Sequence, residues 1–296
     1  NVYTVSVGPI SSNWDRAVET FYQIKGGQID YGVSHSERYG IIQKPNGKVF
    51  SGLYPEWDAD HPVHIISHSM GGQTAQMLEY LLHTQFPDEQ NHLMNESYTG
   101  WIKSITSISS PHNGTTRASI FLDFFPFIQT LMTFFMGIME DSMVENIYDF
   151  DLEQWGLKRT GKESLNDYID RVRESPLNKS KNFSSWDLSP EGARQINSLY
   201  KTDPRTHYFT FPTYASKKQK ENSRHRPDSE MAWHLWHSSY VLGKYEGLDS
   251  TWYENDGVVN TISMGCPTTG EKGPEPSKDY DGISIPGVWQ NMGKIH

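Results

Sequence analysis

The chain has 296 residues, of which 35% are hydrophobic and 13% aromatic, and a formal net charge of −10 at pH 7. This length allows a large α/β domain with a substantial core, and the aromatic content excludes a disordered or fibrous chain. The longest basic run is Lys217-Lys218, which excludes nucleic acid as a partner, because binding it requires a concentrated cationic face. The single cysteine, Cys266, excludes an internal disulfide framework.

The first part of the chain predicts a strand followed by a helix. Residues 2–8 alternate apolar and polar side chains, as in a strand with one buried face. In the following stretch, SSNWDRAVETFYQI, Ser12 precedes Asp15 by three residues. This pair is typical of a cap that opens an amphipathic helix.

The middle and later parts of the chain alternate between strand and helix patterns. A turn-rich loop is predicted first, and the region after the last predicted strand is loop-like and rich in Trp, His and Gly. Alternation of this kind favours an α/β fold with a mostly parallel sheet and helices on both faces. The predicted elements are a loop at 39–57, strands at 63–67, 104–109 and 207–214, and helices at 72–83, 163–174 and 189–200.

The most hydrophobic stretch of the chain is FLDFFPFIQTLMTFFMGIM, residues 121–139. Its length approaches that of a membrane span, but Asp123, Pro126 and Gln129 argue against one, so no integral membrane segment is expected. Two interpretations remain. The stretch is either an ordinary buried helix or a surface-active flap that is covered in water and released at lipid.

A serine lies between a predicted strand and a predicted helix in HIISHSMGGQTAQ, residues 64–76. Ser69 is followed by Gly71 and Gly72, and a sharp strand-to-helix turn of this kind lifts a serine hydroxyl into a cleft. The usual motif has glycine two residues before the serine, where this chain has Ser67. Because the side chain of Ser67 is small enough to replace that glycine, Ser69 is still the candidate nucleophile.

A serine nucleophile needs a histidine base that is oriented by a carboxylate. In an α/β-hydrolase these partners follow the serine in the order acid, then histidine. The best stretch for the acid is ENDGVVN, residues 254–260, where Asp256 precedes a glycine in a turn. The competing carboxylates are Asp249, Asp279 and Asp281.

Six ordered motifs resemble the secreted triacylglycerol lipases of staphylococci and thermophilic bacilli: VGPISSNWDRA, DYGVSHSERYG, HSMGGQTA, SSPHNGTT, EQWGLKR and ENDGVVNTISM. The resemblance covers nearly the whole chain and implies an α/β-hydrolase fold. It implies that Ser69 is the nucleophile, Asp256 the triad acid and the Met70 N–H one oxyanion donor. Residues 121–139 match the lid of that family, within an insertion at about 112–185.

The same resemblance implies that residues 1–296 form a single domain that is incomplete at both ends. The second oxyanion donor of the family comes from a loop upstream of anything in this chain. The triad histidine of the family is expected about three residues beyond His296. His296 itself is the fallback base.

The family also implies metals. Asp15, His35 and Glu153 match three of four zinc ligands, whereas Ile41 occupies the position of the second histidine. Because zinc prefers four N, S or O ligands, three leave a weaker site or none. The alternative for His35 is a surface histidine hydrogen-bonded to Asp15. Calcium is expected from the resemblance alone, with ligands mainly around and beyond the catalytic histidine.

The sequence therefore predicts a secreted, extracellular lipase that hydrolyses triacylglycerols at the lipid–water interface through an acyl-enzyme. A variant that also cleaves phospholipids belongs to the same class. The alternative from another class is a non-catalytic lipid-surface binder built on a hydrolase scaffold.

Overall fold

The computed structural model describes the chain in two compact units. Described are residues 1–116, 150–161, 163–245, 247–271 and 273–296. Unit 1 consists of Asn1–Pro55, Phe86–Asn95 and Phe121–Trp186, and unit 2 of Glu56–Gln85, Glu96–Ile120 and Asp187–His296. The predicted lid, 121–139, lies outside the described residues. Within the described part of the chain, no helix has the length and apolar character needed to cross a membrane.

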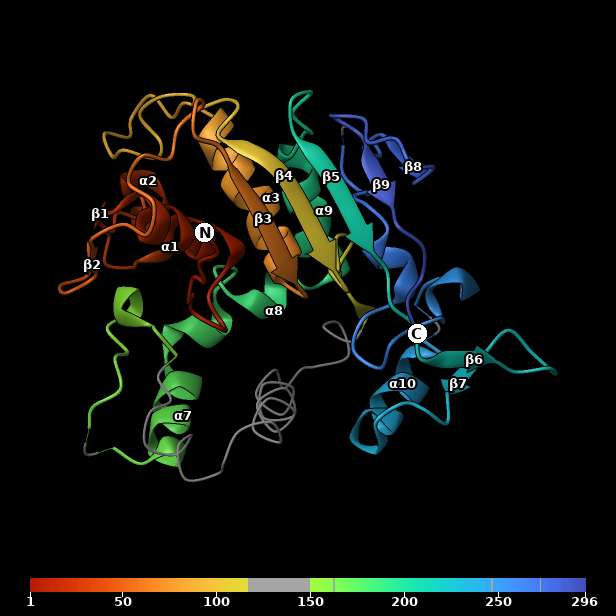
Figure 1. Ribbon diagram of the computed structural model, residues 1–296. Coiled ribbons are helices and arrows are strands. Elements are labelled where there is room, and N and C mark those ends of the chain that lie inside the picture. The colour runs from red at the N-terminus through yellow and green to blue at the C-terminus, as the bar shows by residue number, and fades with distance from the viewer. Residues whose placement is uncertain (117–149, 162, 246, 272) are drawn as a thin grey trace. The chain divides into compact units, whose positions relative to one another are not determined.

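Unit 2 is built on a five-stranded sheet in which all neighbouring strands are parallel (Figure 1). This confirms the mostly parallel sheet that the alternating pattern predicts. The spatial order is β3 (Val63–His68), β4 (Ile102–Ile108), β5 (His207–Phe211), β9 (Trp289–Asn291) and β8 (Ser277–Asp279). The sequence predicts the first three of these strands and misses β8 and β9, which are only three residues long.

Helix α3 (Gly71–His83) packs against β3 and β4. On β3 the side chains of His64, Ile66 and His68 are exposed, and Ile66 is 77% exposed. The helix α9 (Pro190–Leu199) begins where the sequence predicts, with Ser189 as its cap: the Ser189 hydroxyl accepts a hydrogen bond from the Gly192 N–H at 3.0 Å. Further elements of unit 2 are the hairpin strands β6 (Ser216–Lys218) and β7 (His225–Pro227), the helix α10 (Trp236–Leu242) and the 3-10 turns η3 (Trp233–Leu235), η4 (Ser250–Trp252) and η5 (Thr261–Met264).

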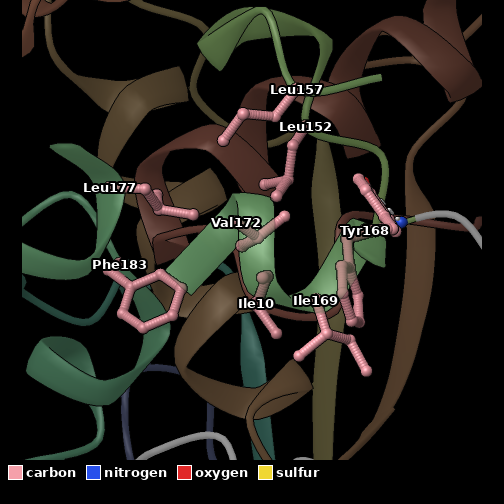
Figure 2. Packing of buried hydrophobic residues seen from close by; sticks show 9 residues of the cluster. Ile10, Leu152, Leu157, Tyr168, Ile169, Val172, Leu177 and Phe183 are labelled. Atoms are coloured by element: carbon pink, nitrogen blue, oxygen red, sulfur yellow. Dashed lines mark hydrogen bonds between the residues drawn. The ribbon is translucent and has the colours of Figure 1, made fainter. Parts of the chain in front are cut away.

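Unit 1 is mainly helical and has its own apolar core. Its elements are α1 (Asn13–Lys25), α2 (Val33–Tyr39), η1 (Glu153–Trp155), α7 (Leu165–Glu174), η2 (Pro176–Lys179) and the two-residue strands β1 (Gly27–Gln28) and β2 (Val49–Phe50). The short helix α8 (Ser184–Asp187) follows. The core combines Ile10 with side chains of residues 150–183 (Figure 2). Within the predicted insertion, apolar side chains of the described residues 150–183 thus pack together with Ile10 from the first part of the chain.

The predicted strand at residues 2–8 is wrong. These residues have no strand partner among those described, and Val2 is 96% exposed. The Gln23 side chain instead pairs with the backbone N–H and carbonyl of Ser6, at 2.9 and 2.5 Å. An alternating pattern alone does not supply the neighbouring strand that a ladder requires.

A buried carboxylate, Glu79, joins α3 to the segment that leads into β5. Both of its oxygens accept hydrogen bonds from the Tyr208 hydroxyl at 2.8 Å, and one accepts from Tyr200 at 2.9 Å. The Tyr208 hydroxyl also accepts from the Asp203 N–H at 2.7 Å. Burial raises the pKa of Glu79 to about 7, although the two tyrosines oppose the shift.

We expect Glu79 to make the protein less stable as the pH rises from about 4.5 to 7. Because its pKa is higher in the folded than in the unfolded chain, the unfolded chain loses its proton first, which favours unfolding. Over this range the expected loss is on the order of 3 kcal/mol. The measurement is urea unfolding of wild type and Glu79→Gln at several pH values, and the glutamine variant should have a flatter profile. A profile that Glu79→Gln leaves unchanged would contradict this assignment.

Candidate active site

Ser69 lies between β3 and α3 and has a left-handed backbone conformation, with φ of 54°. This conformation is uncommon for a residue with a side chain and costs about 1–2 kcal/mol. The turn is held on one side by the hydrogen bond from the Ser69 N–H to the Ile108 carbonyl, at 2.9 Å. Ser69 is therefore on a strained corner at the carboxyl end of its strand, which is the local geometry that the sequence predicts.

The corner is tight because α3 approaches the end of β4 closely at Gly72. A Cβ atom at this position would lie 2.4 Å from the Ser110 Oγ and 3.2 Å from the Ser107 Cβ. Only glycine avoids these clashes without a shift of the backbone. Glycine at position 72 is therefore required by the packing of α3 against the sheet.

Met70, the predicted oxyanion donor, is the N-cap residue of α3 and its side chain is buried. The first N–H groups of a helix have no acceptor within the helix, and they bind negative charge well. The position of Met70 directly after Ser69 is thus compatible with a donor role for its N–H.

Asp256 is held by three donors in a loop of unit 2. Its Oδ1 accepts hydrogen bonds from the N–H groups of Val258 and Val259 at 2.9 and 2.8 Å, and its Oδ2 accepts from the Thr213 hydroxyl at 2.8 Å. Burial raises the pKa of Asp256 overall, while these three donors act in the opposite direction. Its orientation is therefore fixed by the surrounding chain.

The competing carboxylates have other partners or lie in solvent. Asp249 accepts from the N–H of Thr251 at 2.8 Å, and Asp281 lies 3.0 Å from the Lys278 ammonium. Asp279 is exposed on β8. Among the four candidates, the local surroundings favour Asp256 as the acid.

The hydroxyl of Thr213 connects Asp256 to the end of β4. Its Oγ1 lies 2.8 Å from Asp256 Oδ2 and 2.9 Å from the hydroxyl of Ser109. A hydroxyl has one proton, so Thr213 donates to the carboxylate and accepts from Ser109. Thr213 was not among the predicted site residues, although its place near the end of the predicted strand at 207–214 was a usable signal, because the carboxyl ends of parallel strands meet at one edge of a sheet.

Ser109 repeats the backbone conformation of Ser69, with φ of 52°. It follows β4, the neighbour of β3, and its N–H donates to the Phe211 carbonyl at 3.1 Å. The carboxyl ends of three adjacent parallel strands therefore carry Ser69, Ser109 and, shortly after β5, Thr213.

The structure does not support His296 as the fallback base. The imidazole of His296 lies 3.3 Å from Asp228 Oδ2 and 3.2 Å from Glu230 Oε2, and its ring contacts Tyr214. Among the described residues no hydrogen bond joins it to Ser69 or Asp256.

Two other histidines lie in motifs of this unit. The buried His112 donates from Nδ1 to Gln76 at 2.7 Å and accepts at Nε2 from the Ser107 hydroxyl at 2.8 Å. Burial lowers the pKa of His112 to about 3, so its imidazole is neutral, and both ring nitrogens are used in hydrogen bonds within the protein. His68 precedes the candidate nucleophile. The electrostatic effect of His68 lowers the pKa of Asp256 and so partly opposes the effect of burial.

We expect Thr213→Val to raise the pKa of Asp256 further. Valine has the shape of threonine but removes the hydroxyl that stabilises the ionised carboxylate. The measurement is a pH titration of ¹³C-labelled aspartate by NMR, with the Asp256 signal assigned from Asp256→Asn. Thr213→Ser is the matched control, because it keeps a hydroxyl and should titrate like wild type. Equal curves for the valine and serine variants would refute the role given to Thr213.

In unit 1 the structure brings together two of the predicted zinc residues. His35 Nε2 lies 2.9 Å from Asp15 Oδ1, and the imidazole stacks on Trp14 with ring centroids 4.7 Å apart. The Asp15 carboxylate also accepts from the side-chain amides of Gln154 at 3.0 Å and Asn182 at 3.1 Å. Its oxygens are thus occupied by hydrogen-bond donors.

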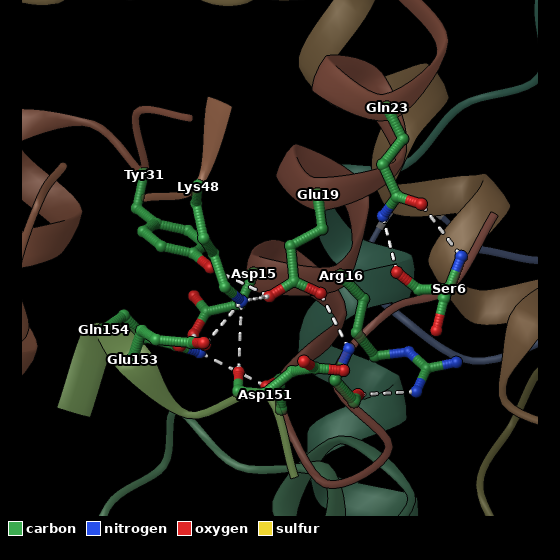
Figure 3. Close-up of polar contacts among 12 residues, drawn as sticks. Ser6, Asp15, Arg16, Glu19, Gln23, Tyr31, Lys48, Asp151, Glu153 and Gln154 are labelled. Carbon is green, nitrogen blue, oxygen red and sulfur yellow. Dashed lines mark hydrogen bonds and ion pairs between the residues drawn. The ribbon is translucent and has the colours of Figure 1, made fainter. Parts of the chain in front are cut away.

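The third predicted ligand, Glu153, is directed to lysines rather than to Asp15. Its carboxylate lies 3.1 Å from the ammonium of Lys48 and 3.4 Å from that of Lys158. Lys48 also lies 3.3 Å from the buried Glu19, which accepts from the Tyr31 hydroxyl at 2.8 Å (Figure 3). Burial lowers the pKa of Lys48, but Glu19 and Glu153 outweigh this and raise it overall.

These residues do not fit a zinc site. Ile41 is buried and has no ligating atom, amide donors face Asp15, and a lysine ammonium lies against Glu153. Within the described part of the chain, no group of three or more His, Cys, Asp or Glu side chains is arranged to hold a metal ion. The geometry instead agrees with the alternative interpretation of His35 as a hydrogen-bond partner of Asp15.

We expect the stability of unit 1 to depend on Lys48 rather than on zinc. Lys48→Met should lower the free energy of unfolding by on the order of 3 kcal/mol, because it removes the ammonium that lies between the buried Glu19 and Glu153 and leaves only the exposed Lys158 beside Glu153. Lys44→Met is the control: Lys44 pairs with Asp30 at 3.0 Å but is 57% exposed, so its loss should cost at most about 1 kcal/mol.

The same experiment tests the metal directly. Addition of 1,10-phenanthroline, which chelates zinc but hardly binds calcium, should leave the melting temperature unchanged. Ile41→His should gain no stabilisation from added zinc, since Glu153 remains bound to lysines. A rise in melting temperature of Ile41→His with zinc would show that the ligands converge after all.

Three features define an α/β-hydrolase fold: the parallel sheet, the strained corner at Ser69 and the loop after β5 that carries Asp256. A family model described as "Lipase-like, C-terminal domain" matches residues 1–295. The chain belongs to this lipase-like family, as the six motifs indicate.

Relatives of known sequence are lipases. The chain is 36% identical over 302 residues to a lipase of Staphylococcus hyicus, which covers 98% of this chain and 45% of that protein. It is 36% identical over 275 residues to lipase 1 of Staphylococcus aureus, covering 90% of this chain and 39% of that protein. The chain thus spans less than half the length of these relatives.

Solved structures are similar over nearly the whole chain. EstA from Clostridium botulinum superposes with a TM-score of 0.89 at 33% identity, covering 99% of this chain and 71% of that one. Lipase 1 from Pelosinus fermentans gives 0.85 at 36% identity, with 99% and 80% covered. The Staphylococcus hyicus lipase gives 0.80 at 33% identity, with 99% and 75% covered.

Proposed function

We propose that this protein is a secreted lipase that hydrolyses the ester bonds of triacylglycerols at a lipid–water interface. The observation that carries the proposal is the strained corner at Ser69, with φ of 54° between β3 and α3. Strained conformations persist where the surrounding structure enforces them, and they cluster at active sites. The family relationship supports ester hydrolysis as the reaction at this serine.

In this proposal the Ser69 hydroxyl attacks the acyl carbonyl and transfers its proton to a histidine that Asp256 orients. The N–H of Met70 stabilises the oxyanion of the tetrahedral intermediate, and collapse of that intermediate releases the alcohol and leaves an acyl-enzyme. Water then attacks the acyl-enzyme and releases the fatty acid. The histidine is not His296, whose imidazole is held by Asp228 and Glu230.

The finer expectations belong to the same proposal. An extracellular location is part of the proposal and rests on the resemblance of the six motifs to secreted lipases. The substrate class includes phospholipids if the site accepts a charged headgroup on the alcohol side of the ester bond. Calcium remains an expectation from the resemblance, with no ligand assigned in this chain.

We expect Ser69→Ala to lower ester turnover by about 10⁴–10⁶-fold, because it removes the nucleophile. The measurement uses a soluble short-chain chromogenic ester and emulsified triacylglycerol, with protein purified after expression of the complete gene. Asp256→Asn should also be strongly impaired, whereas His296→Ala should retain wild-type turnover. Full activity of Ser69→Ala would overturn the proposal.

The assay also separates the alternative function. A non-catalytic lipid binder would bind emulsified lipid but turn over neither substrate, in wild type and Ser69→Ala alike. Turnover that His296→Ala abolishes would instead restore His296 as the base and contradict its observed place in the structure.

A further inference from the structure

An exposed aromatic stripe runs along η3 and α10. Trp233, Trp236 and Tyr240 are 80%, 48% and 42% exposed. Their spacing of three and four residues places them on one side of a helical segment. The buried side of the same segment carries Ser238, Ser239 and Leu242. Large aromatic rings therefore face solvent, whereas the buried side holds two serines and one leucine. An ordinary surface helix places its large apolar side chains on the buried side.

The polar parts of these rings are compatible with a boundary between water and an apolar phase. The Trp236 indole N–H donates to the Met231 carbonyl at 2.9 Å, and the Lys244 ammonium lies 4.2 Å from the centre of the Tyr240 ring. Tryptophan and tyrosine have an apolar body and one polar atom, and they are enriched where membranes meet water.

A basic hairpin adjoins the stripe. Residues 216–227, which include β6 and β7, carry five Lys or Arg side chains and one carboxylate in a chain whose net charge is −10. Lys217 is paired with Asp228 at 2.7 Å. Lys218, Lys220 and Arg226 are exposed. A cationic cluster in an otherwise acidic protein is complementary to an anionic surface.

The hairpin and the stripe are firmly joined. α10 packs on β7 (Figure 1), and the His225 N–H donates to the Gly243 carbonyl at 2.8 Å. A Cβ atom at Gly243 would lie 2.3 Å from the His225 carbonyl oxygen. The strand register pairs Lys218 with His225, whose Cβ faces Gly243, so Lys218 lies on the face of the hairpin toward α10. We call Trp233, Trp236, Tyr240, Lys218 and Lys220 the aromatic–basic patch.

The patch lies beside the loop that carries Asp256. At Gly257, where φ is 97°, a Cβ atom would be 2.9 Å from the Leu235 Cβ and 3.3 Å from the Met231 Sδ. The turn η3 thus packs directly on the residue that follows Asp256. A surface bound at the patch would lie next to the candidate active site.

We propose that the aromatic–basic patch docks the protein onto an anionic lipid–water interface, with the aromatic rings inserted and the hairpin cations at the anionic headgroups. The choice of lipid as occupant rests on the proposed function. The preference for an anionic interface rests on the charge of the hairpin. This surface is made of described residues, none of which belongs to the hydrophobic stretch 121–139.

The test is flotation of the purified protein with phosphatidylcholine vesicles, with and without phosphatidylglycerol. Trp233→Ala/Trp236→Ala should reduce binding to both vesicles by about tenfold or more. Lys218→Gln/Lys220→Gln should reduce binding only to anionic vesicles, by about fivefold for each cation removed, and salt should abolish the difference. Tyr280→Ala and Arg194→Gln, which alter an exposed aromatic residue and an exposed cation elsewhere, should bind like wild type.

Binding does not require turnover, so Ser69→Ala should bind vesicles like wild type whatever the ester assays show. Circular dichroism checks the fold of each variant, and the single variant Trp233→Ala serves if the double variant unfolds. Wild-type binding by a folded tryptophan variant would overturn the proposal. So would equal binding of wild type to neutral and anionic vesicles, or a dimer in sedimentation equilibrium that Trp233→Ala dissociates.

Discussion

The close approach of α3 to the end of β4 is the constraint on which the candidate site depends. Because Gly72 leaves no room for a side chain beside Ser107 and Ser110, the chain must turn at Ser69 within a single residue. The parallel register then sets Ser69 and Ser109 at equivalent positions on adjacent strands. The energy of two left-handed serines is offset by the packing that the sharp turns allow.

Features that depend on a few neighbouring residues could be predicted from the sequence. The caps at Ser12 and Ser189 and the serine corner are each specified within a few residues, and the structure has them as predicted. Prediction failed where the structure depends on distant partners. Residues 2–8 alternate apolar and polar side chains but have no neighbouring strand in the part of the chain that the structure describes. Strand β9 is too short to show a period, although its residues pair with both β5 and β8.

The contacts of the candidate acid could be predicted only in part. Asp256 in an Asp-Gly turn is visible in the sequence, but its link to Thr213 joins residues 43 positions apart. In unit 1 Asp15 and His35 lie together, as neighbouring ligands would, whereas Glu153 contacts lysines instead. On the short turn η1 adjacent side chains point in different directions, so Gln154 rather than Glu153 reaches Asp15. At Asp15 the neighbouring side chain is therefore the amide of Gln154, which donates a hydrogen bond, and not the carboxylate of Glu153, which could have bound a metal.

The ammonium of Lys48 has a consequence for how unit 1 keeps its charge balanced. A bound metal ion is in equilibrium with the medium, so its occupancy follows the free concentration and any competing ligand. A cation on a side chain is synthesised with the protein and is present once in every molecule. Its occupancy is independent of dilution, and its only route of loss is deprotonation, which Glu19 and Glu153 move further from neutral pH. The charge of Glu19 and Glu153 is therefore neutralised by a covalently attached group and does not depend on the supply of metal ions.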